Sequence, residues 1–423
     1  MIHATQALSY IDPGTGSMLF TLIVGLISAS YFFVRKLVIR LKVTLSGGAS
    51  RGGERLPYVI FSDDKRYWNV FGPICDEFER RGLPLAYWTV SPDDPALSVP
   101  YEHVRCEFIG EGNRAFARLN TMSADVVLAT TPGLDVYQWK RSKDVGWYAH
   151  IFHAVGSMAD YRMFSLDFYD EALLAGDIQG EEIRELEVLR DEEPKRLTMV
   201  GSTYMDSLAA RLVASPELPP ADRRTVLLAP TWGPNAILAV YGEKIIEALV
   251  STGWRVVVRP HPQTLKSEPE VIGPLLERWP EGGPDVEWNR DVDNFDCLHA
   301  ADVLITDFSG IIYDYALVFD GPVIYAEGRF DPTVYDAAWF DHPLKRFGYY
   351  EQLGIALSEE QLPHMGELLE QALANKGLAQ AREMVRDEIW QCRGEAASRV
   401  ADALVARRAE LVDKSEKGSE ASS

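Results

Sequence analysis

Short apolar runs alternate with helical patterns over most of this chain, and this alternation constrains the fold more than any other feature. The runs are rich in Val, Ile, Leu and aromatic residues, which is typical of strands buried on both faces. A first series of strand candidates covers residues 58–61, 85–90, 104–109, 126–129, 147–152 and 172–175. A second series covers 226–229, 254–258, 303–305 and 322–325. Strands that alternate with helices predict an α/β fold of doubly wound parallel sheets.

The length of 423 residues is enough for two domains of ordinary size. We expect a first Rossmann-like domain over 55–215 and a second over 222–411, because the stretch between them is rich in Pro, Ala and Asp. Residues 357–411 have the pattern of two or three helices. Residues 412–423 are polar and charged, and we expect a disordered tail there.

The N-terminal region predicts a membrane anchor. Residues 18–34 carry no charge over 17 positions, which is the short end of a membrane span. No Lys or Arg precedes this run, and four follow it: Arg35, Lys36, Arg40 and Lys42. The positive-inside rule then places residues 1–17 outside and the rest of the chain in the cytoplasm, as a single-pass protein of the inner membrane. We therefore expect a transmembrane helix with a basic juxtamembrane segment over 18–45 and a flexible linker over 46–54.

A cleaved signal peptide is the alternative to this anchor. Its basic n-region is missing, however, and the basic cluster lies on the other side of the apolar run.

The formal charge of −21 argues against nucleic acid as a partner, because no broad basic surface is available. A bound anion would need a local cationic pocket. The four cysteines are scattered and form no Cys-x-x-Cys pair, which indicates reduced thiols rather than a disulfide framework or a zinc site. Asp291 and Asp293 form an Asp-x-Asp pair that binds metal in some glycosyltransferases, but its polar surroundings favour a capped, solvated turn. We expect no metal and no organic cofactor.

The second half of the chain contains a cationic turn directly after a strand candidate. Residues 259–262 are Arg-Pro-His-Pro, and two prolines cannot continue a central strand. Arg259 and His261 therefore lie at the carboxyl edge of the sheet, where open α/β sheets bind their ligands. This pattern predicts a phosphate site. The alternative is a loop whose Arg and His contact local carboxylates.

Two other strand candidates of this half also end in polar turns. Thr231 follows one of them, and the sequence Asp307-Phe308-Ser309-Gly310 joins another to a predicted helix over 311–319. Ser309 and Gly310 then lie at the first turn of that helix, where free N–H groups and the helix dipole favour a phosphate. A plain N-cap is the alternative for the same residues. Three strand ends at one edge of a sheet predict a nucleotide pocket.

In the first half, the strand candidate over 147–152 ends at His153. Gly156 and Ser157 follow it, so this histidine is expected to face the space between the two domains. The ordinary pKa of histidine lies close to neutrality, which suits a general base. A packed or surface histidine is the alternative.

These elements together resemble a known family. His153 with Gly156, Ala-Pro-Thr-Trp at 229–232, Arg-Pro-His-Pro at 259–262 and Asp-Phe-Ser at 307–309 have the order and approximate spacing of the CDP-glycerol glycerophosphotransferases, the primases and polymerases of teichoic acid. Residues 201–206 also resemble a segment of that family, and the resemblance covers about 55–395. It implies a GT-B-like fold in which two Rossmann-like domains face a cleft, with a CDP-alditol held mainly by the second domain. It also implies membrane-associated work on a lipid-linked or polymeric acceptor.

Three positions depart from the family pattern. Ala154 and Val155 separate His153 from Gly156 where the family has His-Gly, Gly233 stands where Arg is common, and Gly310 replaces a second serine. These departures leave the phosphate site in place and leave the identities of donor and acceptor open.

We therefore expect an enzyme that transfers an alditol phosphate, glycerol phosphate foremost, from a CDP-linked donor to an acceptor hydroxyl and releases CMP. His153 and His261 are the predicted catalytic residues, with Gly156 and Ser157 on the acceptor side. The predicted donor-binding residues are Thr231, Arg259, His261, Asp307, Ser309 and Gly310. Two alternatives stay open: a glycosyltransferase of the same architecture that uses a nucleotide sugar, and an anchored nucleotide-binding scaffold without catalysis.

Overall fold

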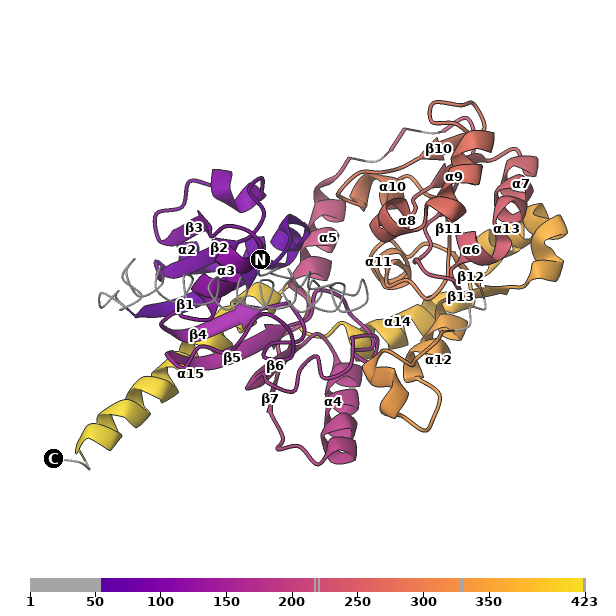
Figure 1. Ribbon diagram of the computed structural model, residues 1–423. Helices are drawn as coiled ribbons and strands as arrows, with labels where there is room; N and C mark the ends of the chain where they lie inside the picture. The colour runs from indigo at the N-terminus through magenta and orange to yellow at the C-terminus, as the bar shows by residue number, and fades with distance from the viewer. Residues whose placement is uncertain (1–54, 217, 220, 327–329, 421–423) are drawn as a thin grey trace, which may run out of the picture. The chain divides into compact units, whose positions relative to one another are not determined.

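The computed structural model describes residues 55–420 apart from 217, 220 and 327–329. Residues 56–423 form one compact unit, and the predicted membrane segment over 18–45 and the linker over 46–54 lie outside the described residues. Within the described part, no helix combines the length and the apolar character that a membrane crossing requires. The unit is built on two parallel sheets, which confirms the α/β architecture (Figure 1).

The first sheet has seven strands in the order β3-β2-β1-β4-β5-β6-β7, and all its pairings are parallel. Its strands are β1 (Leu56–Ser62), β2 (Leu85–Thr89), β3 (Val104–Phe108), β4 (Ala124–Ala129), β5 (Val145–Ile151), β6 (Glu171–Leu174) and β7 (Arg196–Met199). The helical elements that connect them are η1 (Lys65–Tyr67), α2 (Trp68–Arg80), η2 (Pro95–Ser98), α3 (Gly112–Leu119), α4 (Asp177–Arg190) and α5 (Thr203–Ala214). The connection to the second sheet follows α5, at the predicted domain boundary.

The second sheet has six parallel strands in the order β10-β9-β8-β11-β12-β13. Its strands are β8 (Thr225–Leu228), β9 (Arg255–Val258), β10 (Val286–Trp288), β11 (Val303–Thr306), β12 (Val323–Ala326) and β13 (Gly354–Leu357). The helices among these strands are α6 (Ile237–Tyr241), α7 (Glu243–Ser251), α8 (Pro262–Ser267), α9 (Pro269–Arg278), α10 (Phe295–His299), α11 (Ile311–Val318), η3 (Asp336–Trp339) and α12 (Lys345–Leu353). After β13 come η4 (Glu359–His364), α13 (Met365–Ala374), α14 (Leu378–Ile389) and α15 (Ala396–Glu420).

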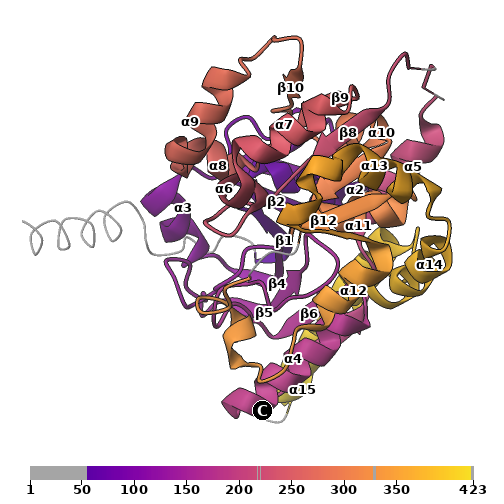
Figure 2. The same cartoon turned by 90° about the vertical axis from the view of Figure 1, so that its right-hand side faces the viewer.

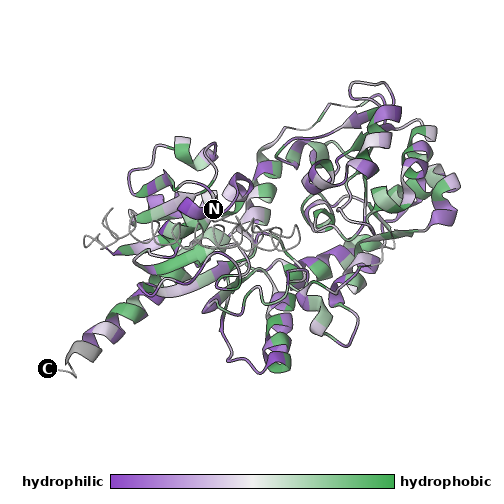
Figure 3. Cartoon of the chain, in the orientation of Figure 1, coloured by the Kyte–Doolittle hydropathy of each residue, from purple (hydrophilic) through white to green (hydrophobic). Residues whose placement is uncertain are grey.

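Both faces of each sheet are covered. In β1, Val59 and Phe61 belong to one apolar cluster, while Tyr58 and Ile60 belong to another on the opposite face. In the second sheet, β12 contacts α11 on one face and α13 on the other (Figure 2). Strands that are buried on both faces are apolar at most positions, and β4 carries the hydrophobic colour over most of its length in Figure 3.

The C-terminal helix α15 packs on the first sheet rather than the second. Val400 and Leu404 join the apolar cluster that lies on the face of β1 and β4, and Arg407 forms a buried ion pair with Glu171 of β6 (Nε–Oε2 3.1 Å). The helix lies along β4 in Figure 1. The predicted second domain over 222–411 includes the first part of α15, but this helix packs on the first sheet. Sequence order alone could not indicate this return of the chain.

The predicted disordered tail over 412–423 is corrected in part, because α15 continues to Glu420. Helix nucleation is unfavourable, whereas extension of an existing helix by one residue is not. The polar residues after 411 therefore extend a helix that the packing of its earlier residues already stabilises.

Candidate functional site

Three polar segments meet at one edge of the second sheet, as the sequence predicts. They follow β8, β9 and β11, and β8 is the neighbour of both other strands. Two hydrogen bonds continue the ladder past the strand ends: the Arg259 N–H donates to the Leu228 carbonyl (2.8 Å) and the Ala229 N–H donates to the Ile305 carbonyl (2.9 Å). The sheet therefore brings residues 229–236, 259–262 and 307–310 together.

Arg259 is held at this edge by neutral acceptors. Its guanidinium donates to the side-chain oxygen of Asn289 and to the backbone carbonyl of Asp291 (2.9 Å). Among the described residues no carboxylate forms an ion pair with it. The half-buried guanidinium thus keeps its positive charge for an anionic ligand, and the alternative of a local carboxylate partner does not apply to this arginine.

His261 caps the short helix α8 with one ring nitrogen. Its Nδ1 accepts a hydrogen bond from the Gln263 N–H (3.1 Å), and its ring stacks with the Trp232 ring at a centroid distance of 6.3 Å. Burial, with a smaller contribution from the Arg66 charge, lowers the pKa of His261 to about 4. The imidazole is therefore neutral near pH 7, and because Nδ1 accepts, its proton is on Nε2. His261 thus presents a hydrogen-bond donor from a fixed ring.

Asp307 positions the loop after β8. The carboxylate is fully buried and accepts from the Thr231 N–H (2.8 Å) and from the Ile237 N–H (3.0 Å). Burial raises the pKa of Asp307 to about 6, while these backbone donors act in the opposite direction. Both carboxylate oxygens thus accept hydrogen bonds from the protein backbone. Asp307 therefore holds the backbone of Thr231 in place and has no free oxygen to offer to a CDP-linked substrate.

Ser309 and Gly310 lie at the start of α11, as the sequence predicts. Gly310 is the exposed N-cap residue, and a β-carbon added to it would meet no atom within 4 Å. The first turn of an α-helix leaves N–H groups without an intrahelical acceptor, and the helix dipole makes that end positive. This end of α11 can therefore accept a phosphate beside the polar segments after β8 and β9.

His153 follows β5 in the first sheet. Its Nδ1 lies 3.0 Å from the Thr130 hydroxyl and 3.2 Å from the Tyr161 hydroxyl, and its ring contacts the rings of Tyr161 (centroid distance 5.8 Å) and Tyr67 (5.0 Å). Burial, followed by the Arg66 charge, lowers the pKa of His153 to about 4. When Nδ1–H donates to the Thr130 oxygen, Nε2 is left as an unprotonated acceptor. The lowered pKa corrects the expectation of a near-neutral histidine, because it makes Nε2 a weaker base that is free of a proton at pH 7.

The two residues predicted on the acceptor side are used in packing. Gly156 has a φ of +91°, and a β-carbon there would lie 2.7 Å from the Tyr313 ring, so only glycine lets this loop pack against α11. The Ser157 hydroxyl donates to Glu182 (2.8 Å), which also accepts from the Met158 N–H (2.7 Å). Gly156 and Ser157 thus hold the loop that carries His153.

The sequence analysis missed Arg66, whose charge reaches both histidines. Arg66 lies in η1, just beyond the carboxyl end of β1, and Tyr67 beside it contacts the His153 ring. Its Nε donates to Asp64 (2.9 Å), and the side chain stays half exposed. The rule that ligands bind at the carboxyl ends of parallel strands could have indicated this residue, because the rule applies to the first sheet as well as to the second.

We expect the substitution Arg66→Gln to raise the pKa of His153 and of His261, because a nearby positive charge disfavours the protonated imidazole. NMR titration of the imidazole C–H signals measures both values. Arg80→Gln, an exposed arginine of α2 that pairs with Glu77, is the matched control and should leave both titrations unchanged. If Arg66→Gln left both titrations unchanged as well, Arg66 would not belong to this site.

Asp291 and Asp293 behave as a solvated turn. Asp293 pairs with Arg211 and accepts from the Phe295 N–H (2.7 Å), and Asp291 accepts from the Asn289 side chain (2.7 Å). Among the described residues no cluster of three or more His, Cys, Asp or Glu side chains is arranged to hold a metal ion.

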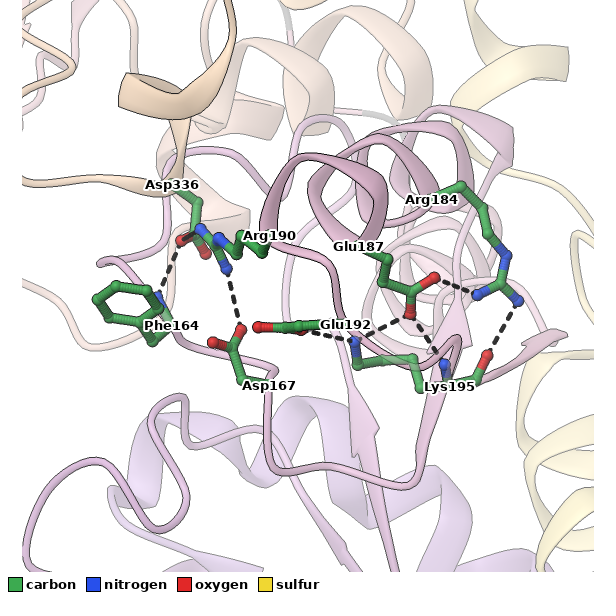
Figure 4. A network of polar contacts seen from close by, with 8 residues as sticks. All are labelled: Phe164, Asp167, Arg184, Glu187, Arg190, Glu192, Lys195 and Asp336. Carbon is green, nitrogen blue, oxygen red and sulfur yellow. Dashed lines mark hydrogen bonds and ion pairs between the residues drawn. The ribbon is translucent and has the colours of Figure 1, made fainter.

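A buried ionic network ties the first sheet to the segment before α12. Arg190 at the end of α4 lies between Asp167 (Nη1–Oδ1 2.9 Å) and the fully buried Asp336 (Figure 4). Asp336 also accepts from the Phe164 N–H (2.9 Å), and its own N–H donates to the Tyr161 carbonyl (2.8 Å). The network thus fixes the segment around Asp336 against the loop that contacts His153.

Residues 203–403 match the model of the family described as CDP-Glycerol:Poly(glycerophosphate) glycerophosphotransferase. The matched range contains all three strand ends of the second sheet, and His153 lies outside it. No curated protein matches the chain.

Among solved structures, the wall teichoic acid polymerase TagF is 15% identical, with a TM-score of 0.55, and the match covers 92% of this chain and 98% of TagF. A TagF variant soaked with CDPG is 14% identical, with a TM-score of 0.52 and coverage of 92% and 99%. The UDP-GlcNAc 2-epimerase of Neisseria meningitidis, bound to UDP-GlcNAc, is 12% identical, with a TM-score of 0.51 and coverage of 82% and 99%. At these identities the likeness shows the fold, which is GT-B-like.

Proposed function

We propose that this chain transfers glycerol phosphate from CDP-glycerol to an acceptor hydroxyl, on the basis of its match over residues 203–403 to the model of the CDP-glycerol glycerophosphotransferase family. CMP is the other product, and the acceptor is a lipid-linked or polymeric precursor of a teichoic-acid-like surface polymer. The observation that carries this proposal is the anion site at one sheet edge, which combines the unneutralised guanidinium of Arg259, the Nε2–H of His261 and the first turn of α11.

The reaction exchanges one phosphorus–oxygen bond for another. The acceptor oxygen attacks the phosphorus that carries glycerol, a new P–O bond forms, and the P–O bond to the CMP phosphate breaks. The acceptor proton passes to Nε2 of His153. Phosphoryl transfer requires positioning and charge stabilisation more than covalent help from the protein, and the residues of the second sheet supply both.

His261 and Arg259 act on the leaving group. Negative charge grows on the CMP phosphate as its bond to glycerol phosphate breaks. The neutral imidazole of His261 can donate a hydrogen bond from Nε2 to this phosphate. The guanidinium of Arg259 can do the same, and no ion pair has to be broken first.

The direct test is an assay of the purified full chain with CDP-glycerol and an acceptor extract, with nucleotide sugars supplied in parallel. Release of CMP from CDP-glycerol in step with the incorporation of glycerol phosphate into the acceptor is the expected result. Release of a nucleoside diphosphate from a sugar donor, without CMP, would instead identify a glycosyltransferase. Binding of CDP without turnover of any donor would identify a nucleotide-binding scaffold.

We also propose that the catalytic body lies in the cytoplasm, anchored by residues 18–45, because the basic residues Arg35, Lys36, Arg40 and Lys42 all follow the apolar run. A cytosolic nucleotide donor requires this location. A reporter fused after residue 423 should be active only if it is of the kind that works in the cytoplasm. Activity of an export-dependent reporter at the same position would overturn the topology, and a fusion of that reporter to a known exported protein serves as the positive control.

A further inference from the structure

Arg346 of α12 is a buried arginine without a role in the proposed reaction. A guanidinium inside a protein is costly unless partners match both its charge and its N–H groups. The partners of Arg346 therefore show which parts of the chain this side chain holds together.

Two nitrogens of this guanidinium contact two different loops. Nη1 forms an ion pair with Asp160, in the loop that follows β5. Nη2 donates to the Phe308 carbonyl (2.6 Å), in the segment that joins β11 to α11, and to the Tyr350 hydroxyl (2.6 Å). Because the guanidinium is planar and rigid, its two nitrogens have fixed positions relative to each other. Arg346 therefore sets the spacing between the loop after β5 and the segment before α11.

Each of these two segments carries a group that the proposed reaction needs. Asp160 precedes Tyr161, whose hydroxyl lies 3.2 Å from Nδ1 of His153 and whose ring stacks with the imidazole at a centroid distance of 5.8 Å. Phe308 precedes Ser309, which lies beside the first turn of α11 in the proposed phosphate site. One side chain thus connects the support of the proposed base to the proposed site of the donor phosphates.

Aromatic rings surround the guanidinium. Its central carbon lies 5.5 Å from the ring centroid of Phe330, 5.2 Å from that of Phe347 and 5.5 Å from that of Tyr350. The faces of aromatic rings attract a cation, and charges that are shielded from water interact more strongly than exposed charges. The contacts of Arg346 therefore hold its two partner segments more firmly than an ion pair at the surface would.

The loop after β5 has other contacts that keep it in place. The Ala337 N–H donates to the Ala159 carbonyl (2.9 Å), and the Asp336 N–H donates to the Tyr161 carbonyl (2.8 Å), so backbone hydrogen bonds flank Asp160 on both sides. We therefore expect that a change at Arg346 displaces this loop slightly and does not unfold it.

We propose that Arg346 is a positioning residue, which holds the loop that supports His153 at the correct distance from the donor phosphates. This assignment rests on the proposed function. A misplacement of about 1 Å can lower the rate of an enzyme by about 100-fold. The contribution of Arg346 is therefore to the rate of transfer.

Arg346→Lys and Asp160→Asn test the two ends of this connection. Lysine keeps the charge but has a single nitrogen, and Asp160→Asn removes the ion pair, so neither variant fixes the spacing of the two segments. Both should lower kcat with CDP-glycerol by about 10- to 100-fold. The Kd for CDP should stay nearly unchanged, because Arg259 and His261 are held by other partners. Single-turnover kinetics and CDP titration of the full chain measure the two quantities.

The background of His153→Ala separates a positioning role from a structural one. Without the imidazole there is no base to hold in place, so Arg346→Lys should not lower the remaining rate of His153→Ala any further. A residue that only stabilises the fold would lower the rates of both backgrounds by the same factor. Asp160→Asn in the same two backgrounds decides the question if Arg346→Lys fails to fold, since Asp160 is only half-buried.

Arg407→Lys is the matched control. Arg407 is also a buried arginine with a carboxylate partner, Glu171, and it lies 4.5 Å from the ring centroid of Trp147, but these partners belong to β6 and β5. It should leave kcat unchanged. Ordinary kcat in Arg346→Lys and Asp160→Asn, or an equal loss in the His153→Ala background, would overturn the assignment and leave the proposed function standing. Absence of CMP release from CDP-glycerol by the parent chain would overturn both.

Discussion

Replacement of His153 by alanine is expected to reduce turnover by about 100-fold or more while CDP affinity stays nearly unchanged. The imidazole touches the acceptor hydroxyl in the proposed mechanism and does not touch the nucleotide. Its ring is already fixed by Thr130 and by the flanking rings of Tyr67 and Tyr161, so the base does not have to be ordered during the reaction. Single-turnover kinetics and CDP titration of the same preparations measure the two quantities.

His364→Ala is the matched control, because His364 is an exposed histidine of η4 that pairs with Glu367 and lies outside the candidate site. It should change neither quantity. His153→Gln keeps polar contacts with Thr130 and Tyr161 and removes the base, so it should lose turnover like the alanine variant. Ordinary turnover in both His153 variants would remove the base from the mechanism. A large loss of CDP affinity would place His153 in the donor site.

The pH dependence of kcat/KM is a second test of His153 as the base. Burial and Arg66 lower the pKa of His153 to about 4, so Nε2 stays unprotonated from neutral pH down to that value. The acid limb of kcat/KM, which reports the free enzyme, should therefore lie near pH 4 to 5 rather than near the ordinary histidine value of about 6.5. In His153→Ala the contribution of His153 to this limb should be lost, while His261, whose pKa is also lowered to about 4, still titrates in the same range.

The strands that the sequence misses are all edge strands, although the sequence does predict the edge strand β3. All ten strand candidates are present, and β7, β10 and β13 are the strands without a prediction. Each of these three lies at the edge of its sheet. A central parallel strand is buried on both faces and is apolar throughout, whereas an edge strand such as β10, with the sequence Val-Glu-Trp, has no such run. Gly354 begins β13, and glycine is not typical of strands. It is needed here because a β-carbon would lie 2.7 Å from the Val323 carbonyl oxygen of the neighbouring strand, and this close approach cannot be predicted from the local sequence.

Some of the predicted site residues are available to a ligand, and others are used in contacts within the protein. Arg259, His261 and the start of α11 lie at the end of predicted strands, and sheet topology alone brings them together. Asp307 and Ser157 have the right chemistry and an adjacent position. However, the Asp307 carboxylate accepts from the Ile237 N–H and the Ser157 hydroxyl donates to Glu182, and both partners are far away in the sequence. Which polar side chain stays available to a ligand depends on tertiary contacts, and local patterns do not contain that information.

Substitution of Arg259 or His261 is expected to weaken CDP binding as well as turnover, since both side chains contact the donor phosphates in the proposed mechanism. A hydrogen bond to a charged group contributes about 1.5–3 kcal/mol, and about 1.4 kcal/mol corresponds to a tenfold change in affinity. Arg259→Ala should therefore raise the Kd for CDP by about 10- to 100-fold. Arg255→Ala removes a charge from the same strand, where the exposed Arg255 pairs with Glu287, and should leave the Kd unchanged.

His261 requires a variant that spares the helix, because its Nδ1 caps α8. His261→Asn is suitable, since asparagine is a good N-cap residue and its shorter side chain does not reach the position of Nε2. It should weaken CDP binding by about 10-fold with little change in thermal stability, whereas His261→Ala should lose stability as well. If Arg259→Ala and His261→Asn both bound CDP as tightly as the parent chain, the cationic turn after β9 would serve the structure alone. The phosphate site, and with it the assignment of a CDP-linked donor to this edge of the sheet, would then have to be abandoned.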